Sequence, residues 1–199
     1  MTLPRRRAST KSQKEMNSPI GRTRYSLVAQ TLHWLTVLLV GAAYIVSEGA
    51  PETRVYAAEL AWSLSLHETF GALVLLVLVL RLTLRLFDRA PEEPAVPAWM
   101  AVSSKLVHWL LYALLAAVPL TAIFGAWYEG HPVMVFGVGA IGPFVETSHD
   151  LGRSITRVHP LLGDAIIWIA GVHAAAALFH HFLVRDRVLL SMLPGRRVP

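Results

Sequence analysis

The sequence predicts an all-α integral membrane protein, a four-helix bundle with both chain termini on the cytoplasmic side. Three observations lead to this prediction. The 199 residues are 54% hydrophobic and 16% charged, with a mean hydropathy of +0.49, whereas soluble domains are about 25% charged. Four apolar stretches are long enough to cross a bilayer core, which takes about 20 helical residues. The basic residues are concentrated in the segments that these stretches would leave on one side.

Each predicted helix follows from a run of apolar residues. Three of the runs contain no Asp, Glu, Lys or Arg, and the fourth contains only Glu68. The predicted helices cover four ranges, about 25–48, 61–86, 103–127 and 159–184. The first run is too long for a signal peptide, whose apolar core has about 7–15 residues. Pro160 would lie in the first turn of the fourth helix, where its missing N–H is tolerated.

The helices define one domain over 23–194, between a basic N-terminal tail (1–22) that we expect to be disordered and a C-terminal tail (195–199). Of the 18 Lys and Arg residues, 15 lie near the chain ends or in the segment 81–105, which joins the second and third helices and includes their adjacent ends. The other three are Arg54, Arg153 and Arg157. The positive-inside rule therefore places both termini in the cytoplasm. This distribution explains the pI near 10, and nucleic-acid binding is not expected because no aromatic residues are interleaved with the basic ones.

Four of the nine histidines fall at two depths of the predicted bundle. His159 and His173 are 14 residues apart, which is about 21 Å along a helix and close to a whole number of turns. They therefore share one face of the fourth helix. Because successive helices run in opposite directions, His67 matches the outer depth of His159, and His33 matches the inner depth of His173. The sequence thus predicts two cross-helix pairs, His67 with His159 and His33 with His173.

One imidazole on each side of a planar macrocycle suits a six-coordinate haem iron, which transfers electrons because no axial position is left for a substrate. Zinc instead prefers four ligands, and the absence of cysteine excludes iron–sulfur clusters and covalently attached haem. Gly71 and Gly163, each four residues after a histidine, provide room beside a macrocycle, although small residues also permit close helix packing. A divalent-metal transporter with the histidines as transient ligands is the alternative from another class.

The sequence around these histidines resembles the bacterial cytochrome b561 family. The resemblance is carried by LHWL at 32–35, LHETFG at 66–71 and GVHAAAALFHH at 171–181. In the predicted outer loop, YEGHP at 128–132 and FG at 136–137 are similar to a branch of superoxide:ubiquinone oxidoreductases. The resemblance covers about residues 22–194.

The resemblance implies a protein of the bacterial inner membrane that binds two b-type haems and carries electrons in a respiratory chain. By position, it implies that the iron ligands are His33, His67, His159 and His173. In the branch that this chain resembles, superoxide outside gives up one electron at a time, and the electrons reduce ubiquinone.

Superoxide oxidation coupled to ubiquinone reduction is the leading hypothesis. Arg153 and Arg157 would steer the anion toward His159, but ion pairs with Glu146 or Asp150 explain these arginines equally well. The predicted outer side carries three basic and seven acidic residues, which counts against an anionic substrate. The competing hypothesis is a haem b membrane subunit that relays electrons between a partner dehydrogenase or hydrogenase and the quinone pool.

Polar residues near the cytoplasmic end have more than one interpretation. His180 and His181 either anchor the fourth helix at the membrane interface or deliver protons to a quinone. Arg81 and Arg85 either take part in quinone reduction, hold haem propionates or only set the topology. His108 either packs against its neighbours or lines a haem edge or quinone pocket.

Overall fold

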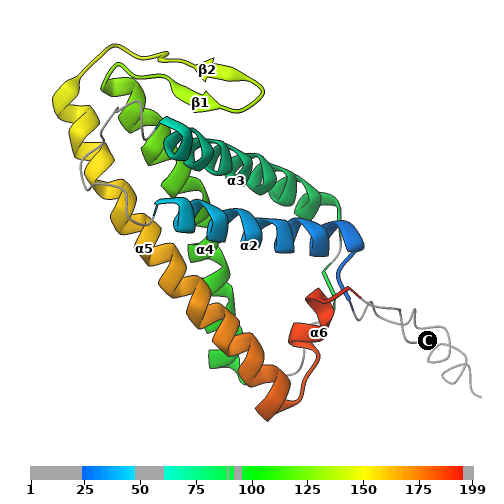
Figure 1. The fold of residues 1–199 in the computed structure, drawn as a ribbon. Coiled ribbons are helices and arrows are strands. Elements are labelled where there is room, and N and C mark those ends of the chain that lie inside the picture. Colours follow the sequence, from blue (N-terminus) through cyan, green and yellow to red (C-terminus); the bar gives the residue numbers. More distant parts are fainter. Residues whose placement is uncertain (1–23, 48–60, 89, 92–95, 195–199) are drawn as a thin grey trace, which may run out of the picture.

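The computed structural model describes residues 24–47, 61–88, 90–91 and 96–194. It confirms the predicted fold class, because the chain is mostly helical and has four helices long and apolar enough to cross a membrane. These helices are α2 (Leu27–Ser47), α3 (Ala61–Phe87), α4 (Ala98–Tyr128) and α5 (His149–Phe179) (Figure 1). The predicted tails, 1–22 and 195–199, lie outside the described residues. The cytoplasmic position of both termini stays a prediction from charge.

Two helices begin earlier than the apolar pattern predicts. α4 starts at Ala98 instead of residue 103, and α5 starts at His149 instead of residue 159. The first turns of α5 are rich in polar residues, so hydropathy does not detect them. Pro160 therefore lies inside α5 and not in a first turn. Since proline has no backbone N–H, it cannot donate the usual helical hydrogen bond to the carbonyl of Thr156.

The fourth span is longer than a bilayer core is thick. α5 continues into a π-helical turn, η2 (His180–Val184), so that 36 helical residues run from His149 to Val184. At 1.5 Å per residue this length is about 54 Å, against about 30 Å for the hydrocarbon core. The polar first turns of α5 can thus lie outside the hydrocarbon layer while His159 lies near its boundary.

The helices form two packed pairs. α2 lies along α3, α4 lies along α5, and the pairs meet mainly through α3 and α4 (Figure 1). All four helices contribute to the buried apolar core, which consists of Leu39, Val74, Val77, Leu78, Leu114, Leu115 and Ile166. Ile166 is seven residues from both His159 and His173, so the core separates the two histidine depths. Many other large apolar side chains are exposed, as expected for a surface that faces lipid.

Two glycines allow α4 and α5 to approach closely at one end. A Cβ atom added at Gly125 would lie 2.6 Å from Thr156 Oγ1, and one added at Gly152 would lie 2.7 Å from Glu129 Cγ. The Thr156 hydroxyl also donates a 2.8 Å hydrogen bond to Glu129 Oε1. The small residues and this polar contact together fix the outer end of the α4–α5 pair.

The connection between α4 and α5 contains a β-hairpin that the sequence did not predict. Strands β1 (Val133–Val135) and β2 (Gly139–Ile141) pair antiparallel. Gly137 in the turn has a φ of +78°, a conformation that glycine adopts without steric cost. The hairpin lies across the ends of α3 and α4 (Figure 1).

A short helix, α6 (Val188–Met192), joins the two helix pairs at the opposite end of the bundle. It follows η2 and returns to the start of α2 (Figure 1). Three consecutive carbonyls accept hydrogen bonds there: Ser191 from the Tyr25 N–H (3.2 Å), Met192 from Trp34 Nε1 (2.9 Å) and Leu193 from Arg24 Nη1 (3.1 Å). The two ends of the described chain therefore meet on one side of the bundle, as an even number of crossings requires.

Candidate functional site

The structure brings together the two histidines predicted to pair at the outer depth. The ring centroids of His67 on α3 and His159 on α5 are 5.9 Å apart, and the ring planes are inclined at 89°. His67 Nδ1 lies 2.9 Å from the Ala43 carbonyl oxygen, and His159 Nδ1 lies 2.9 Å from the Val118 carbonyl oxygen. A carbonyl only accepts hydrogen bonds, so each Nδ1 carries the proton. Each Nε2 is then the nitrogen suited to bind a metal.

The second predicted pair lies at the inner depth. The ring centroids of His33 on α2 and His173 on α5 are 6.5 Å apart. His108 on α4 joins this pair, with its ring centroid 5.2 Å from that of His173. Arg81 on α3 also lies beside the pair, with Nη2 3.5 Å from His33 Nδ1. His108 and Arg81, for which the sequence left more than one role open, thus both lie beside the inner pair.

The separations within the two pairs fit one metal ion between two imidazoles. Two metal–nitrogen bonds of about 2 Å, extended to the ring centres, place the centroids about 6 Å apart. The observed distances of 5.9 and 6.5 Å lie on either side of this value. Among the residues that the structure describes, no group of three or more His, Cys, Asp or Glu side chains is arranged to hold a metal ion. The donor set thus suits a haem iron, whose equatorial ligands come from the macrocycle.

Open space lies beside the paired histidines. A Cβ atom added at Gly71 or Gly163, the two glycines predicted to line a cofactor, would have no heavy atom within 4 Å. The same holds for Gly41 and Gly171. These glycines differ from Gly125, which is needed for helix contact. No protein atom fills these four positions, so each is open either to a cofactor or to lipid.

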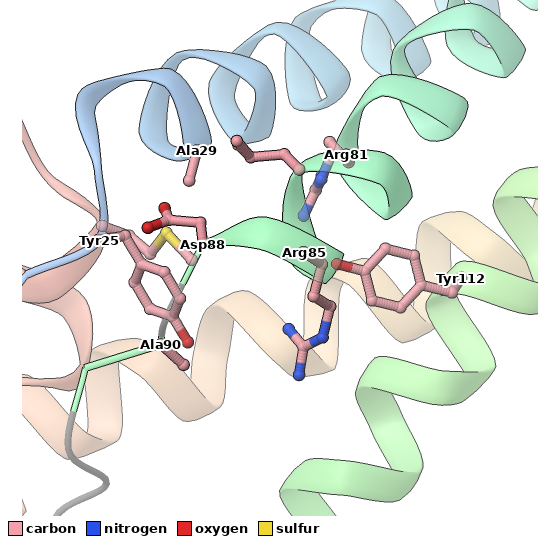
Figure 2. Close-up of a pocket in the computed structure, with 9 residues that line it drawn as sticks. Tyr25, Ala29, Arg81, Arg85, Asp88, Ala90 and Tyr112 are labelled. Carbon is pink, nitrogen blue, oxygen red and sulfur yellow. The ribbon is translucent and has the colours of Figure 1, made fainter.

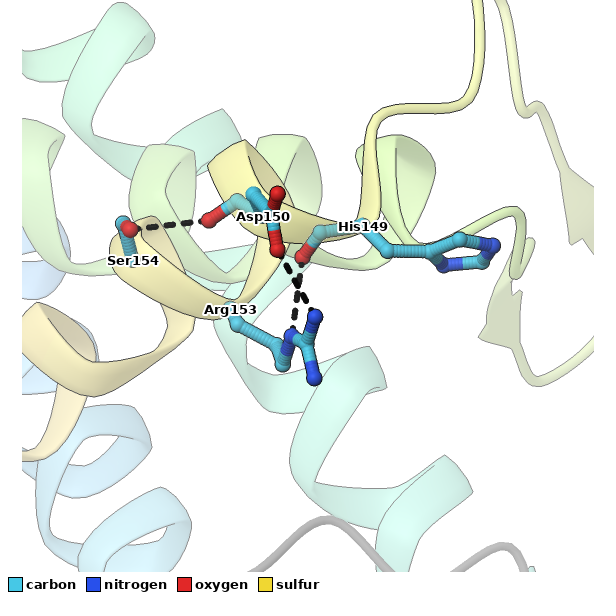
Figure 3. A network of polar contacts seen from close by, with 4 residues as sticks. All are labelled: His149, Asp150, Arg153 and Ser154. Atoms are coloured by element: carbon cyan, nitrogen blue, oxygen red, sulfur yellow. Dashed lines mark hydrogen bonds and ion pairs between the residues drawn. The ribbon is translucent and has the colours of Figure 1, made fainter.

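The predicted superoxide-steering arginines lie on the exposed first turns of α5. Arg153 Nη2 forms an ion pair with Asp150 Oδ1 at 2.8 Å, and Arg153 Nε donates to the His149 carbonyl at 3.3 Å (Figure 3). This is one of the two ion pairs considered from the sequence. Because both side chains are exposed, the pair contributes little stability. Arg157 is also exposed, and it lies two residues before His159.

The β-hairpin is attached to the helix segment that carries His67. The Met134 N–H donates to Glu68 Oε2 at 2.7 Å, and the Phe136 N–H donates to Thr69 Oγ1 at 3.1 Å. Both acceptors directly follow His67 in the chain. The hairpin is therefore held against the segment of α3 that follows His67 by two hydrogen bonds from its backbone N–H groups. The sequence gives no local indication of this attachment, because the two acceptors lie 66 and 67 residues earlier in the chain.

The two histidines at the predicted cytoplasmic end have different surroundings. His180 lies in η2, and its Nδ1 forms a short, half-buried ion pair or hydrogen bond with Asp186 Oδ2. The other carboxylate oxygen of Asp186 accepts the Val188 N–H at 2.9 Å, at the start of α6. His181 packs edge-on against the ring of Phe182. His180 is thus held by a carboxylate, and His181 has an apolar neighbour.

A pocket lies between α2, α3 and α4, at the end of the bundle predicted to be cytoplasmic. Its lining includes Arg81, Arg85, Asp88, Tyr25 and Tyr112 (Figure 2). From the sequence, quinone reduction, propionate binding and membrane topology were the roles considered for the two arginines. The sequence did not predict that they would share a pocket with two tyrosines and with the α6 region, because these segments are distant in the chain.

A model of the prokaryotic cytochrome b561 family matches residues 24–195. The chain belongs to the prokaryotic cytochrome b561 family. This cytochrome is 31% identical over 180 residues to the probable superoxide oxidase CybB of Yersinia pestis, covering 87% of this chain and 98% of the relative. It is 29% identical over 175 residues to cytochrome b561 homolog 1 of Escherichia coli K12, covering 87% and 99%. It is 30% identical over 178 residues to cytochrome b562 of Cereibacter sphaeroides, covering 86% and 96%.

Family membership confirms the resemblance inferred from the histidine-containing motifs. It makes the chain a multi-pass bacterial membrane protein for electron transfer, of a family that binds haem b. This assignment favours the electron-transfer hypotheses over the metal-transport hypothesis. The donor set fits haem b: the paired imidazoles of His33 with His173 and of His67 with His159 are the groups that would hold it. Haem supplies a one-electron iron centre when bound.

Proposed function

We propose that this cytochrome binds two b-type haems, oxidises superoxide on the outer side of the bacterial inner membrane and reduces ubiquinone on the cytoplasmic side. The observation that carries the proposal is the presence of two imidazole pairs at two depths, separated by an apolar core. The name of the Yersinia relative, a probable superoxide oxidase, supports the choice of donor. The basic residues near the chain ends support cytoplasmic termini.

The proposed reaction requires different groups at its two ends. Two superoxide anions lose one electron each and become two O2 molecules, without any proton transfer. Ubiquinone gains these two electrons together with two protons and becomes ubiquinol. Protons are therefore needed only at the cytoplasmic end, where His180 and His181 lie. His180 is the better proton donor of the two, because its Nδ1 is held by Asp186 and its other ring nitrogen can pass a proton on.

The outer end needs only to admit and orient a small anion. Arg153 and Arg157 place two cationic side chains on the turns before His159. A local positive field raises the encounter rate of an anion even where the wider surface is acidic. The ion pair of Arg153 with Asp150 weakens this field, so Arg157 carries the larger part of the proposed steering.

A second function is favoured by the same charge pattern. The predicted outer side has more acidic than basic residues, which suits a cationic protein partner better than an anionic substrate. In this alternative, a docked dehydrogenase or hydrogenase supplies the electrons, and the same haems pass them to the quinone pool. Purified cytochrome that reduces quinone with superoxide alone supports the first function. Activity that appears only with a partner protein supports the second.

Optical spectroscopy with haem-to-protein stoichiometry tests the proposal directly. We expect two b-type haems per chain, both reduced by superoxide and both reoxidised by a ubiquinone analogue. His67→Ala or His159→Ala should remove one haem, and His33→Ala or His173→Ala should remove the other. Retention of both haems in each variant would show that the pairing is wrong.

A further inference from the structure

Arg81 is a cation in the inner part of a membrane-spanning helix, and its described contacts are neutral or aromatic. Arg81 Nη1 donates to Thr36 Oγ1 at 3.0 Å, and its Nη2 lies 3.5 Å from His33 Nδ1. The guanidinium carbon also lies 5.6 Å from the ring centroid of Tyr112. The side chain is only partly exposed. These contacts hold the guanidinium in place beside the inner imidazole pair, and they do not balance its charge.

No carboxylate of the described residues forms an ion pair with Arg81. Among all the residues that the structure describes, ion pairs join only Arg153 to Asp150 and His180 to Asp186. Asp88, the acidic residue of the same pocket, accepts a 2.5 Å hydrogen bond from the Ser26 hydroxyl. A cation inside a membrane span is costly unless an anion or water balances it. The arrangement therefore calls for an anionic group that is not part of the described chain.

The pocket provides further donors for such a group. Arg85 lies one helical turn after Arg81, and Figure 2 shows both side chains extending from α3 toward the space bordered by Tyr25 and Tyr112. A guanidinium binds carboxylates through two parallel hydrogen bonds, and a phenol hydroxyl adds a single donor. A quinone head group is neutral and would leave the charge of Arg81 unbalanced. The chemistry of the pocket therefore suits an oxyanion, above all a carboxylate.

We propose that Arg81, assisted by Arg85, binds the propionate carboxylates of the haem held by His33 and His173. This inference rests on the proposed function, because it assumes a haem at the inner pair. The contact of Arg81 with the His33 ring places the guanidinium next to the imidazole that would bind the iron. The same guanidinium would thus fix the orientation of the cofactor in its plane and favour its reduced form, since a nearby positive charge stabilises the state that has gained an electron.

A redox titration of the full-length cytochrome containing two haems tests this site. In Arg81→Gln, we expect the reduction equilibrium of one haem to become about tenfold less favourable, which is about 59 mV for one electron, while the other haem is unchanged. Arg81→Lys keeps the charge without the two parallel donors and should restore most of the potential. Lys105→Gln, at an exposed position on α4, is the matched control and should change neither haem. Loss of one haem in Arg81→Gln, with retention in Arg81→Lys, also supports the proposal.

A second arm separates haem carboxylates from other oxyanions, such as lipid phosphates. Full-length apoprotein from haem-depleted cells is reconstituted with haem b or with its dimethyl ester, whose carboxylates are blocked. Arg81→Gln changes the local charge with either cofactor, so binding and not potential is compared here: the proposal requires that Arg81→Gln weakens retention of haem b at the inner site relative to the wild type but does not weaken retention of the ester. A difference in retention that persists with the ester would overturn it in favour of a lipid. Unchanged haem potentials with a raised KM for quinone would overturn it in favour of a quinone site.

The two proposals can fail separately. A wild-type protein without two haems contradicts the proposed function and is detected by stoichiometry before any arginine variant is made. A wild-type protein with two haems whose potentials do not respond to Arg81→Gln contradicts the propionate site alone.

Discussion

Replacing Gly163 by leucine separates two explanations for the open space beside His159. Gly163 lies four residues after His159, so the two residues are neighbours on one face of α5. No heavy atom lies within 4 Å of a Cβ atom added there. If the space belongs to a haem, a leucine side chain would occupy it. If the space faces lipid, leucine would be accommodated without effect on the cofactor.

Gly163→Leu should not destabilise the helix bundle, although it should obstruct binding of a cofactor. Leucine is favoured over glycine in a helix interior by about 0.8 kcal/mol, and no protein atom opposes it at Gly163. The bundle itself should therefore be unchanged or slightly more stable. At Gly125, by contrast, a Cβ atom would lie 2.6 Å from Thr156 Oγ1 and 3.3 Å from the Thr156 backbone nitrogen. Overpacking of this kind costs about 1–3 kcal/mol, which exceeds the gain in helix propensity.

Haem content and thermal unfolding, measured on the same samples, distinguish these effects. Gly163→Leu should fall from two haems per chain to one without loss of helix content. Gly125→Ala, the matched control, should keep both haems but unfold at a lower temperature. Two haems in Gly163→Leu would show that the open space is not used by the cofactor, and the reasoning from the glycines would have to be abandoned.

Three further perturbations test other contacts. Replacing Arg153 and Arg157 together by Glu should slow superoxide consumption several-fold and leave haem content intact, because the local positive field is reversed; unchanged stopped-flow kinetics would remove their steering role. Glu68→Ala should cost the hairpin a hydrogen bond of about 1–2 kcal/mol and speed amide hydrogen exchange in β1 about tenfold, whereas Glu68→Gln keeps an acceptor and should change little. Asp186→Asn should slow quinone reduction through His180 while superoxide still reduces the haems; a normal quinone rate would leave His180 as an interface anchor.

Much of the bundle could be predicted because the bilayer imposes a simple length requirement. Four apolar runs located the spans, and the direction of each span assigned depths to the histidines. This was enough to pair His33 with His173 and His67 with His159, since depth depends only on residue count along a straight helix. The rotation of one helix about another is not given by residue count. For that reason the sequence could not decide between packing and a haem-edge position for His108, which lies beside His173.

The outer connection was harder to predict because its structure depends on distant contacts. Strands of three residues are too short to produce a recognisable pattern in the sequence. The hairpin is held by the side chains of Glu68 and Thr69 on α3, which are distant in the chain. The start of α5 at His149 was missed for a different reason. Hydropathy reports only the part of a helix that lies in lipid, and Pro160 was taken as a first-turn residue although it lies inside the helix.

The hydrogen bonds between α6 and α2 bear on how the molecule is assembled during synthesis. Trp34, the neighbour of His33, donates to a carbonyl that lies 158 positions later in the chain. The first span can enter the membrane as soon as it leaves the ribosome, but these contacts cannot form until residues 191–193 have been made. The surroundings of His33 therefore reach their final form only after translation has passed every membrane-spanning helix, so a cofactor held there would be loaded late.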